Sequence, residues 1–291
     1  MKIWITGGAG FLGKRLTTSL KRGGNHIVSL SRRKSPDADE SIAIDLAAQK
    51  EELRTLVQQR GAPDVVVHCA SRQPGSYSLP EFVKSNVIST QLLLDAFRDA
   101  PPRQVIYTST LSVYSKSARL PFTVTHPTSS PAPYAATKRW AEQLLETFRE
   151  AQVIVLRLPS LYGAGQADSF VDGLARLAMK NDDIELFSRG EVIRDALHVS
   201  EVVAAIQTCI ERQPTETFAL MNLGRGRPVT SLEYAETLVS TLDSTSKIIP
   251  VDQPASQFDC WADISKAKRL IGFQPPDLRE SFRSYVDDLR A

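Results

Sequence analysis

The stretch Thr6-Gly-Gly-Ala-Gly-Phe-Leu-Gly13 follows the apolar run Lys2–Thr6 and leads into Phe11–Arg22, which has the apolar spacing of a helix. Glycines at positions 7, 10 and 13 permit a tight turn, a close approach of the backbone to a pyrophosphate, and close packing of helix on sheet. A pyrophosphate would lie at the amino end of this helix. The pattern therefore predicts a dinucleotide-binding turn, and the alternative is a purely structural glycine turn.

Strand-like and helix-like segments alternate through the first half of the chain. The expected strands are His26–Ser31, Asp64–Ala70, Gln104–Ser109 and Val153–Leu158, and the expected helices are Gln49–Gln59, Pro80–Ala100 and Tyr134–Ala151. This alternation predicts parallel strands with right-handed crossovers. We therefore expect an α/β fold with a doubly wound, Rossmann-type parallel sheet, whose ligands lie beyond the carboxyl ends of the strands.

The end of the second expected strand bears on the choice of cofactor. NAD sites place an acidic residue there to accept a hydrogen bond from the ribose 2′-hydroxyl, whereas this chain has Ser31-Arg32-Arg33-Lys34. Guanidinium groups match a 2′-phosphate in geometry and charge. The segment favours NADP(H) over NAD(H). The alternative is a solvated basic turn that Asp37, Asp39 and Glu40 partly neutralise.

Tyr134 and Lys138 stand four residues apart at the start of an expected helix, so their side chains share one helical face. A cation beside a phenol favours the phenolate, which would make Tyr134 a proton donor and acceptor near neutral pH. Thr110 closes the Thr-Ser-Thr run at the end of the preceding strand. A hydroxyl and a phenol at one carbonyl oxygen would polarise it for hydride attack.

Together these segments resemble the extended short-chain dehydrogenases/reductases, in particular the NAD(P)-dependent sugar epimerase/dehydratase family and its nucleotide-sugar ketoreductases. The resemblance spans nearly the whole chain. Its blocks, in order, are the glycine turn, Asp45-Leu46, His68–Ser71, Asn86-Val87, Thr108–Tyr114, Pro133–Lys138, Leu156–Gly163, Arg194-Asp195, Asn222–Gly224 and Asp263–Ala267 with Gly272-Phe273.

The resemblance implies roles for individual residues. Tyr134 would be the general acid/base, Lys138 would bind the nicotinamide ribose and lower the Tyr134 pKa, and Thr110 would hold the reacting oxygen. Cofactor contacts would come from Gly7, Gly10, Phe11, Leu12, Gly13, Ser31, Arg32, Arg33, Asp45, Leu46, Cys69, Ala70, Ser71, Tyr134, Lys138 and Leu161. Substrate contacts would come from Ser71, Arg72, Thr110, Ser160 and Arg194, although Arg72 could instead face solvent. No metal site is expected.

The resemblance also implies the organisation of the chain. We expect a cofactor-binding domain at residues 1–161, to which residues 193–225 return. Residues 162–192 and 226–291 would form a smaller C-terminal α/β lobe for the substrate. A homodimer is expected through a four-helix bundle made by the helices Asn86–Arg98 and Tyr134–Arg149.

Departures from the family pattern narrow the expected reaction. Leu111-Ser112 stands where family dehydratases carry Asp-Glu, so dehydration is not expected. Arg194 is retained as a diphosphate contact, but the stretch from Gln253 to Cys260 lacks the second arginine of the nucleotide-sugar enzymes. Epimerases retain their cofactor and usually use NAD, so the basic Ser31–Lys34 segment favours net reduction.

We therefore expect NADPH-dependent reduction of a keto group, on a nucleotide-diphosphate 4-keto-6-deoxy sugar, with Tyr134 as general acid. The alternatives are an NAD(P)-dependent nucleotide-sugar epimerase, a reductase of a non-nucleotide carbonyl compound, and a non-catalytic NADP-binding regulator.

Composition limits the partners and the compartment. The net charge of +2 over 291 residues gives no electrostatic footprint for nucleic acid. No apolar run approaches the roughly 18 residues of a membrane helix. The three cysteines, at positions 69, 209 and 260, are odd in number and far apart, which indicates a reducing compartment and a cytoplasmic protein.

Overall fold

A computed structural model describes residues 1–115, 119–166, 169–212, 214–256 and 258–290. The chain divides into two compact units. The first comprises Met1–Ser115, Pro127–Arg157 and Val203–Met221, and the second comprises Lys116–His126, Leu158–Val202 and Asn222–Ala291. The segment that returns to the first unit is thus 203–221, which is shorter than the expected 193–225.

A seven-stranded sheet forms the centre of the first unit, in the order β11-β6-β5-β4-β1-β2-β3. The strands are β1 (Lys2–Thr6), β2 (His26–Ser31), β3 (Glu40–Ala43), β4 (Val65–His68), β5 (Gln104–Thr110), β6 (Gln152–Leu158) and β11 (Phe218–Asn222). Neighbouring strands from β3 to β5 pair in parallel. The order reverses on either side of β1, and ligands of doubly wound sheets bind at such a switch point. The expected Rossmann-type sheet is confirmed.

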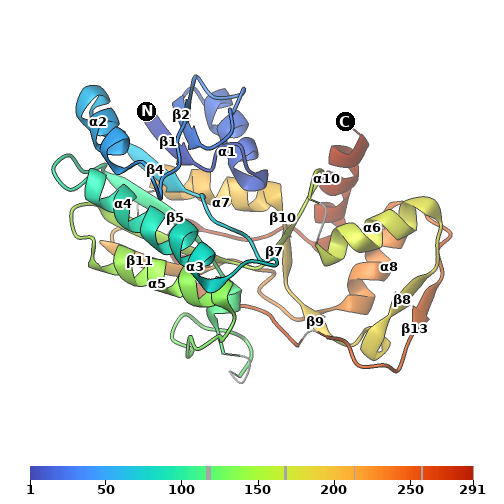
Figure 1. Cartoon of the computed structure of the whole chain (residues 1–291). Helices are drawn as coiled ribbons and strands as arrows, with labels where there is room; N and C mark the ends of the chain where they lie inside the picture. Colours follow the sequence, from blue (N-terminus) through green and yellow to red (C-terminus); the bar gives the residue numbers. More distant parts are fainter. Residues whose placement is uncertain (116–118, 167–168, 213, 257, 291) are drawn as a thin grey trace. The chain divides into compact units, whose positions relative to one another are not determined.

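Helices cover both faces of this sheet (Figure 1). They are α1 (Phe11–Arg22), α2 (Lys50–Arg60), α3 (Leu79–Phe82), α4 (Ser89–Ala96), α5 (Pro133–Thr147) and α7 (Val199–Arg212). One core joins Trp4 and Val105 of the sheet to Leu53, Leu93 and Leu145 of α2, α4 and α5. Each fully buried side chain of this size contributes roughly 1.5–3 kcal/mol. Figure 1 shows α1 and α7 on the other face.

Two of these helices differ from the sequence prediction. The expected helix Pro80–Ala100 ends at Ala96, and its middle, η1 (Val83–Ile88), is a π-helix that directs Asn86 into the interior. Wider turns of this kind often occur at functional sites. The α5 helix ends at Thr147 rather than at Ala151, because Phe148 adopts an extended backbone conformation.

Short strands and helices build the second unit. The paired strands are β7 (Ser160–Tyr162) with β10 (Ala196–His198), β9 (Ile193–Arg194) with β12 (Val229–Thr230), and β8 (Ile184–Leu186) with β13 (Ile248–Pro250). The helices are α6 (Phe170–Lys180), α8 (Ser231–Thr241), α9 (Ser265–Ile271) and α10 (Leu278–Arg290). Tyr162, Tyr234 and Phe282 lie in their common core. Short 3-10 helices, η2 (Leu111–Val113) and η3 (Phe187–Gly190), occur in the first and second unit respectively.

Helix length and the state of the cysteines are two further features of the structure. Within the described ranges, no helix combines the length and the apolarity that a membrane crossing requires. All three cysteines carry free thiols.

Candidate active site

The carboxyl ends of four neighbouring strands bring the predicted residues of the first unit to one edge of the sheet. Because β5, β4, β1 and β2 are parallel and adjacent, their carboxyl ends lie on the same side. The glycine turn follows β1, Arg32 follows β2, Ser71 lies just beyond β4, and Thr110 ends β5. This edge is therefore the candidate site.

The glycine turn fits a pyrophosphate. Gly7 has a φ of +70°, and a Cβ there would lie 2.9 Å from the backbone of Ala70. A Cβ on Gly13 would overlap the Gly7 carbonyl, so both glycines are needed for the turn itself. At Gly10, a Cβ would touch only the Gly7 carbonyl, at 3.1 Å. Within the described chain no side chain caps the start of α1 beside Gly10. The positive end of the helix, which begins with Phe11 and Leu12, is thus available to an anion.

Two of the three acids that could neutralise the basic segment after β2, Asp39 and Glu40, have other partners. Arg32, Arg33 and Lys34 are exposed. Asp39, by contrast, accepts a hydrogen bond from the Ile27 backbone and pairs with Lys21 at 3.0 Å, at the amino end of β2. Glu40 pairs with His26 and Arg60 at the same end. Since β2 has six residues, these carboxylates lie on the order of 20 Å from the arginines along the strand and do not neutralise them.

Ser35 anchors this basic segment beside the glycine turn. Its hydroxyl donates to the carbonyl oxygen of Gly8 at 3.2 Å, and its backbone N–H donates to Ser41 at 2.8 Å. Ser31 donates to the backbone of Arg33 within the segment. The arginines therefore leave β2 next to the turn where the pyrophosphate fits.

Other predicted cofactor residues have mainly structural contacts. The Asp45 carboxylate accepts from the backbone N–H of Ala47, and Leu46 is buried in the core beneath. After β4, the N–H groups of Cys69 and Ala70 both bond to Thr6, which fixes the chain beside the glycine turn. Burial raises the pKa of the Cys69 thiol to about 12, so this cysteine stays protonated at neutral pH.

Lys138 is buried against β5. Its side chain is one helical turn beyond Tyr134 on α5 and is only 2% exposed. Nζ donates to the carbonyl oxygen of Thr108 at 2.6 Å and lies 4.1 Å from the centroid of the Tyr107 ring. Burial lowers the pKa of Lys138 to about 7, although Cys69 and Glu142 act in the opposite direction.

Tyr134 and Thr110 come together as predicted. Burial raises the pKa of the Tyr134 phenol to about 12, and a hydrogen bond with Thr110 opposes this shift. The net direction is the reverse of the expected lowering by Lys138, because loss of hydration outweighs the other contributions. The phenol is therefore neutral at pH 7 and is suited to donating a proton. Thr110 also accepts from the backbone of Ser112, which fixes its hydroxyl.

A buried ion pair, which the sequence analysis missed, supports the end of β5. Glu142 on α5 accepts from Arg157 Nε at 3.0 Å and from Nη2 at 2.7 Å, and the two side chains are 1% and 2% exposed. The same carboxylate accepts from Ser109, the residue before Thr110. The only sequence signal was the position of Glu142 four residues after Lys138, on the same face of α5.

The remaining predicted substrate residues lie in the second unit. Ser160 is exposed in β7, and the next residue, Leu161, which is predicted to contact the cofactor, is half-buried. The Arg194 guanidinium lies 4.7 Å from the Phe170 ring centroid, and its Nε donates to Ser231 at 3.2 Å.

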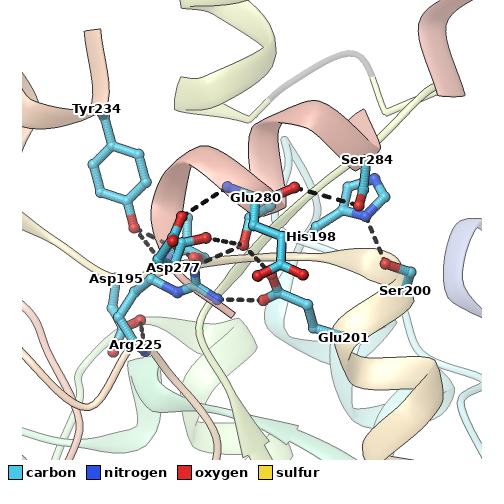
Figure 2. Close-up of polar contacts among 11 residues, drawn as sticks. Asp195, His198, Ser200, Glu201, Arg225, Tyr234, Asp277, Glu280 and Ser284 are labelled. Atoms are coloured by element: carbon cyan, nitrogen blue, oxygen red, sulfur yellow. Dashed lines mark hydrogen bonds and ion pairs between the residues drawn. The ribbon is translucent and has the colours of Figure 1, made fainter. Parts of the chain in front are cut away.

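Figure 2 shows the polar contacts around Asp195, Glu201 and Arg225, which are buried. Asp195 directly follows Arg194 in the chain. Asp195 accepts from the backbone N–H groups of Arg225 and Ala262, at 2.8 and 3.0 Å. The Arg225 side chain donates to Glu201 at 2.6 Å and to Ser281 at 2.9 Å. Burial raises the pKa of Asp195 to about 7. By tying three segments together, Asp195 fixes the backbone from which Arg194 projects.

In the parts of the chain that the structure describes, His, Cys, Asp and Glu side chains nowhere gather in a group of three that could hold a metal ion.

A model of the NAD dependent epimerase/dehydratase family matches residues 3–224, and the chain belongs to this family. Protein CapI of Staphylococcus aureus is 24% identical, over 99% of this chain and 98% of its own length. A UDP-glucuronate 4-epimerase of Thermodesulfobacterium geofontis is 26% identical, over 93% and 90%.

Solved structures agree with this assignment. MoeE5 in complex with UDP-glucuronic acid and NAD is 27% identical, with a TM-score of 0.85 over 100% of this chain and 99% of that chain. UDP-glucose 4-epimerase of Thermotoga maritima, at 22% identity and a TM-score of 0.87, covers 100% and 99% and shows the shared fold. The chain is thus an NAD(P)-dependent enzyme of the oxidoreductase type.

Proposed function

We propose that this protein epimerises a nucleotide-diphosphate sugar by oxidising a ring carbon and reducing it again from the other face. The observation that carries the proposal is the group formed by the half-buried Tyr134 and the buried Thr110 and Lys138 at the carboxyl end of β5. This group lies on the same sheet edge as the glycine turn. The names of the relatives and of the structures with bound UDP-sugars support this substrate class.

The chain supplies proton transfer and binding in this reaction. A bound nicotinamide would accept the hydride from the sugar carbon and return it. Tyr134 would take the proton of the sugar hydroxyl in the oxidation and give it back in the reduction. Thr110 would hold the reacting oxygen beside the phenol. Lys138 would donate to the cofactor ribose, and the start of α1 would hold the pyrophosphate.

A net reductase is the second candidate, favoured by the basic segment after β2. Arg32 and Arg33 would bind the 2′-phosphate of NADPH. Tyr134 would then act as general acid toward a keto group, such as that of a 4-keto-6-deoxy nucleotide sugar. MoeE5, the similar structure at 27% identity, holds NAD, so the preference for NADP(H) remains a prediction.

One experiment separates the two. The purified protein is incubated with UDP-sugars, the products are analysed by NMR, and absorbance at 340 nm is followed with added NADH or NADPH. Epimerisation gives a new UDP-sugar with no net consumption of reduced cofactor. Consumption of NADPH with a nucleotide-linked ketone would establish the reductase. Consumption of NADPH only with free carbonyl compounds would indicate a reductase of a non-nucleotide carbonyl compound. Binding of the cofactor without turnover of any substrate would indicate a non-catalytic, NADP-binding regulator.

Measurements of NADPH and NADH binding test whether the basic segment after β2 holds a 2′-phosphate. Arg33→Ser should weaken NADPH binding about tenfold or more through loss of a charge-assisted hydrogen bond, and leave NADH binding unchanged. Arg22→Ser, at the exposed end of α1, is the matched control. Equal effects of both substitutions would remove the 2′-phosphate assignment.

A homodimer in the cytoplasm is the assembly and location we propose. Ile88 of η1 and Trp140 of α5 are large apolar side chains that are 41% and 43% exposed, on the two helices expected to form the four-helix bundle. A second copy would bury them. Light scattering at micromolar concentration should give twice the monomer mass, and a monomer would contradict the proposal.

A further inference from the structure

We propose that Arg72 binds a carboxylate on the sugar ring, so that the substrate is a nucleotide-diphosphate hexuronate rather than a neutral hexose. This inference rests on the proposed function and concerns its substrate class. Arg72 lies just beyond β4, between the glycine turn and the end of β5.

Asn86 ties the backbone of Arg72 to α5, the helix that carries Tyr134. The buried Asn86 side chain accepts from the backbone N–H of Arg72 at 2.8 Å and donates to Thr137 at 3.1 Å. Thr137 immediately precedes Lys138 on α5. One amide, directed inward by the π-helical turn, therefore fixes the start of the Arg72 side chain relative to α5.

An aromatic series links the guanidinium to Tyr134. The Cζ atom of Arg72 lies 4.2 Å from the centroid of the Tyr77 ring. The rings of Tyr77 and Phe82 form a T-shaped pair with centroids 5.8 Å apart, and the centroids of Phe82 and Tyr134 are 6.2 Å apart. Nε of Arg72 also donates to Ser85 at 3.2 Å. The planar guanidinium is thus held in one orientation before any ligand binds, which reduces the entropy cost of binding.

The existing acidic partner of Arg72 is weak. Nη1 lies 3.5 Å from one oxygen of Glu81, whose side chain is 49% exposed. The other oxygen of Glu81 already accepts from the backbone and hydroxyl of Ser78, both at 2.9 Å. Exposed ion pairs contribute at most about 1 kcal/mol. The structure gives no partner for Nη2 of Arg72 among the described residues. A ligand carboxylate can therefore bind the outer edge of the guanidinium in competition with Glu81.

The charge at this end of the sheet suits an anion. The ammonium of Lys138, one turn along α5 from Tyr134, is already directed to the carbonyl oxygen of Thr108. The neutral 6-hydroxymethyl group of a hexose would leave the guanidinium without a charged partner. A hexuronate differs from that hexose only in carrying a carboxylate at the same carbon, and it would supply the partner.

UDP-glucuronic acid and UDP-glucose are the probes, because they differ only in that group. Calorimetry on the cofactor-loaded protein should show at least about tenfold tighter binding of UDP-glucuronic acid. Arg72→Gln should weaken that binding about tenfold to a hundredfold and change UDP-glucose binding less than about twofold. Glu81→Gln should tighten UDP-glucuronic acid binding by removing the competing carboxylate. Arg54→Gln, on exposed α2, is the matched control.

The contrary outcomes are distinct. Equal binding of the two probes, or equal weakening of both in Arg72→Gln, would overturn the carboxylate assignment and leave the nucleotide-sugar function intact. Weakened binding of NAD(P)H in Arg72→Gln would reassign Arg72 to the cofactor. Failure of the unmodified protein to bind either probe would overturn both the inference and the proposed function. If Arg72→Gln does not fold, the preference of the unmodified protein between the two probes and the effect of Glu81→Gln still test the carboxylate assignment.

Discussion

The Nζ atom of Lys138 donates a 2.6 Å hydrogen bond to the backbone carbonyl of Thr108, two residues before Thr110 on β5. The ammonium is thereby held against β5, where it also lies 4.1 Å from the centroid of the Tyr107 ring. Burial brings the pKa of Lys138 to about 7 and that of Tyr134 to about 12. Tyr134 therefore carries its proton throughout the neutral range, whereas the charge of Lys138 is sensitive to its surroundings.

Tyr134→Phe should lower kcat about 100- to 10,000-fold, because it removes the proton donor and leaves the ring packed on Phe82. Binding of the nucleotide sugar and the thermal midpoint should change little, since only one hydroxyl is lost. Steady-state kinetics and calorimetry measure the two effects separately. Near-native turnover of Tyr134→Phe would show that another group carries the proton.

Glu142→Gln should destabilise the fold by about 3–5 kcal/mol, because it leaves the buried Arg157 guanidinium without its charge partner. Urea denaturation measures the change. Glu146→Gln, on the exposed face of the same helix, is the control and should cost less than about 0.5 kcal/mol.

A second substitution sharpens this test. Adding Arg157→Met to Glu142→Gln should restore part of the lost stability, because no buried charge then remains uncompensated. If Glu142→Gln behaved like Glu146→Gln, the ion pair would not stabilise the end of β5.

Local signals made much of the fold predictable. The turn from Gly7 to Gly13 needs those glycines for steric reasons within a few residues, so its sequence pattern is direct evidence of its shape. The same holds for the common face of Tyr134 and Lys138, which follows from helix geometry. Both features appear in the structure where the sequence analysis placed them.

Long-range and environmental effects were not accessible in this way. The pairing of Glu142 with Arg157 joins a helix to a strand, and no spacing rule connects them. The π-helical turn at 83–88 uses the same residue types as an α-helix. Strands such as β9 and β12 have two residues each, too few to show a period. The Tyr134 pKa shift reverses the expected direction because burial, which depends on the whole fold, outweighs the nearby charge.

His68 should make stability depend on pH below neutrality. Its two ring nitrogens bond to the hydroxyls of Thr6 and Thr90, at 2.7 and 2.9 Å, and burial lowers its pKa from 6.5 to about 3. The unfolded chain therefore takes up a proton that the folded chain excludes. As pH falls from 6.5 toward 3, proton uptake by His68 in the unfolded chain favours unfolding, so stability that is present above pH 6.5 is lost.

Between pH 7 and pH 5 the loss due to His68 should be about 2 kcal/mol, measured as the free energy of unfolding in urea. His68→Gln should be less stable at pH 7 but should show a flatter pH dependence. An identical slope in His68→Gln would show that the ring does not titrate between the folded and unfolded states as described.

Alanine at Gly13 should reduce the stability of the protein, whereas alanine at Gly10 should reduce cofactor binding. At Gly13 a Cβ would overlap the Gly7 carbonyl, so Gly13→Ala should lower the stability of the cofactor-free protein by about 1–3 kcal/mol. At Gly10 the backbone angles of −82° and 175° suit any residue, and the Cβ meets one atom at 3.1 Å. Gly10→Ala should therefore change that stability by less than about 1 kcal/mol.

Gly10→Ala should weaken NAD(P)H binding at least about tenfold, since the methyl group would occupy the approach of the pyrophosphate. Thermal unfolding and fluorescence titration with NADH and NADPH provide the two measurements. Unchanged cofactor affinity in Gly10→Ala would mean that the pyrophosphate does not approach this turn.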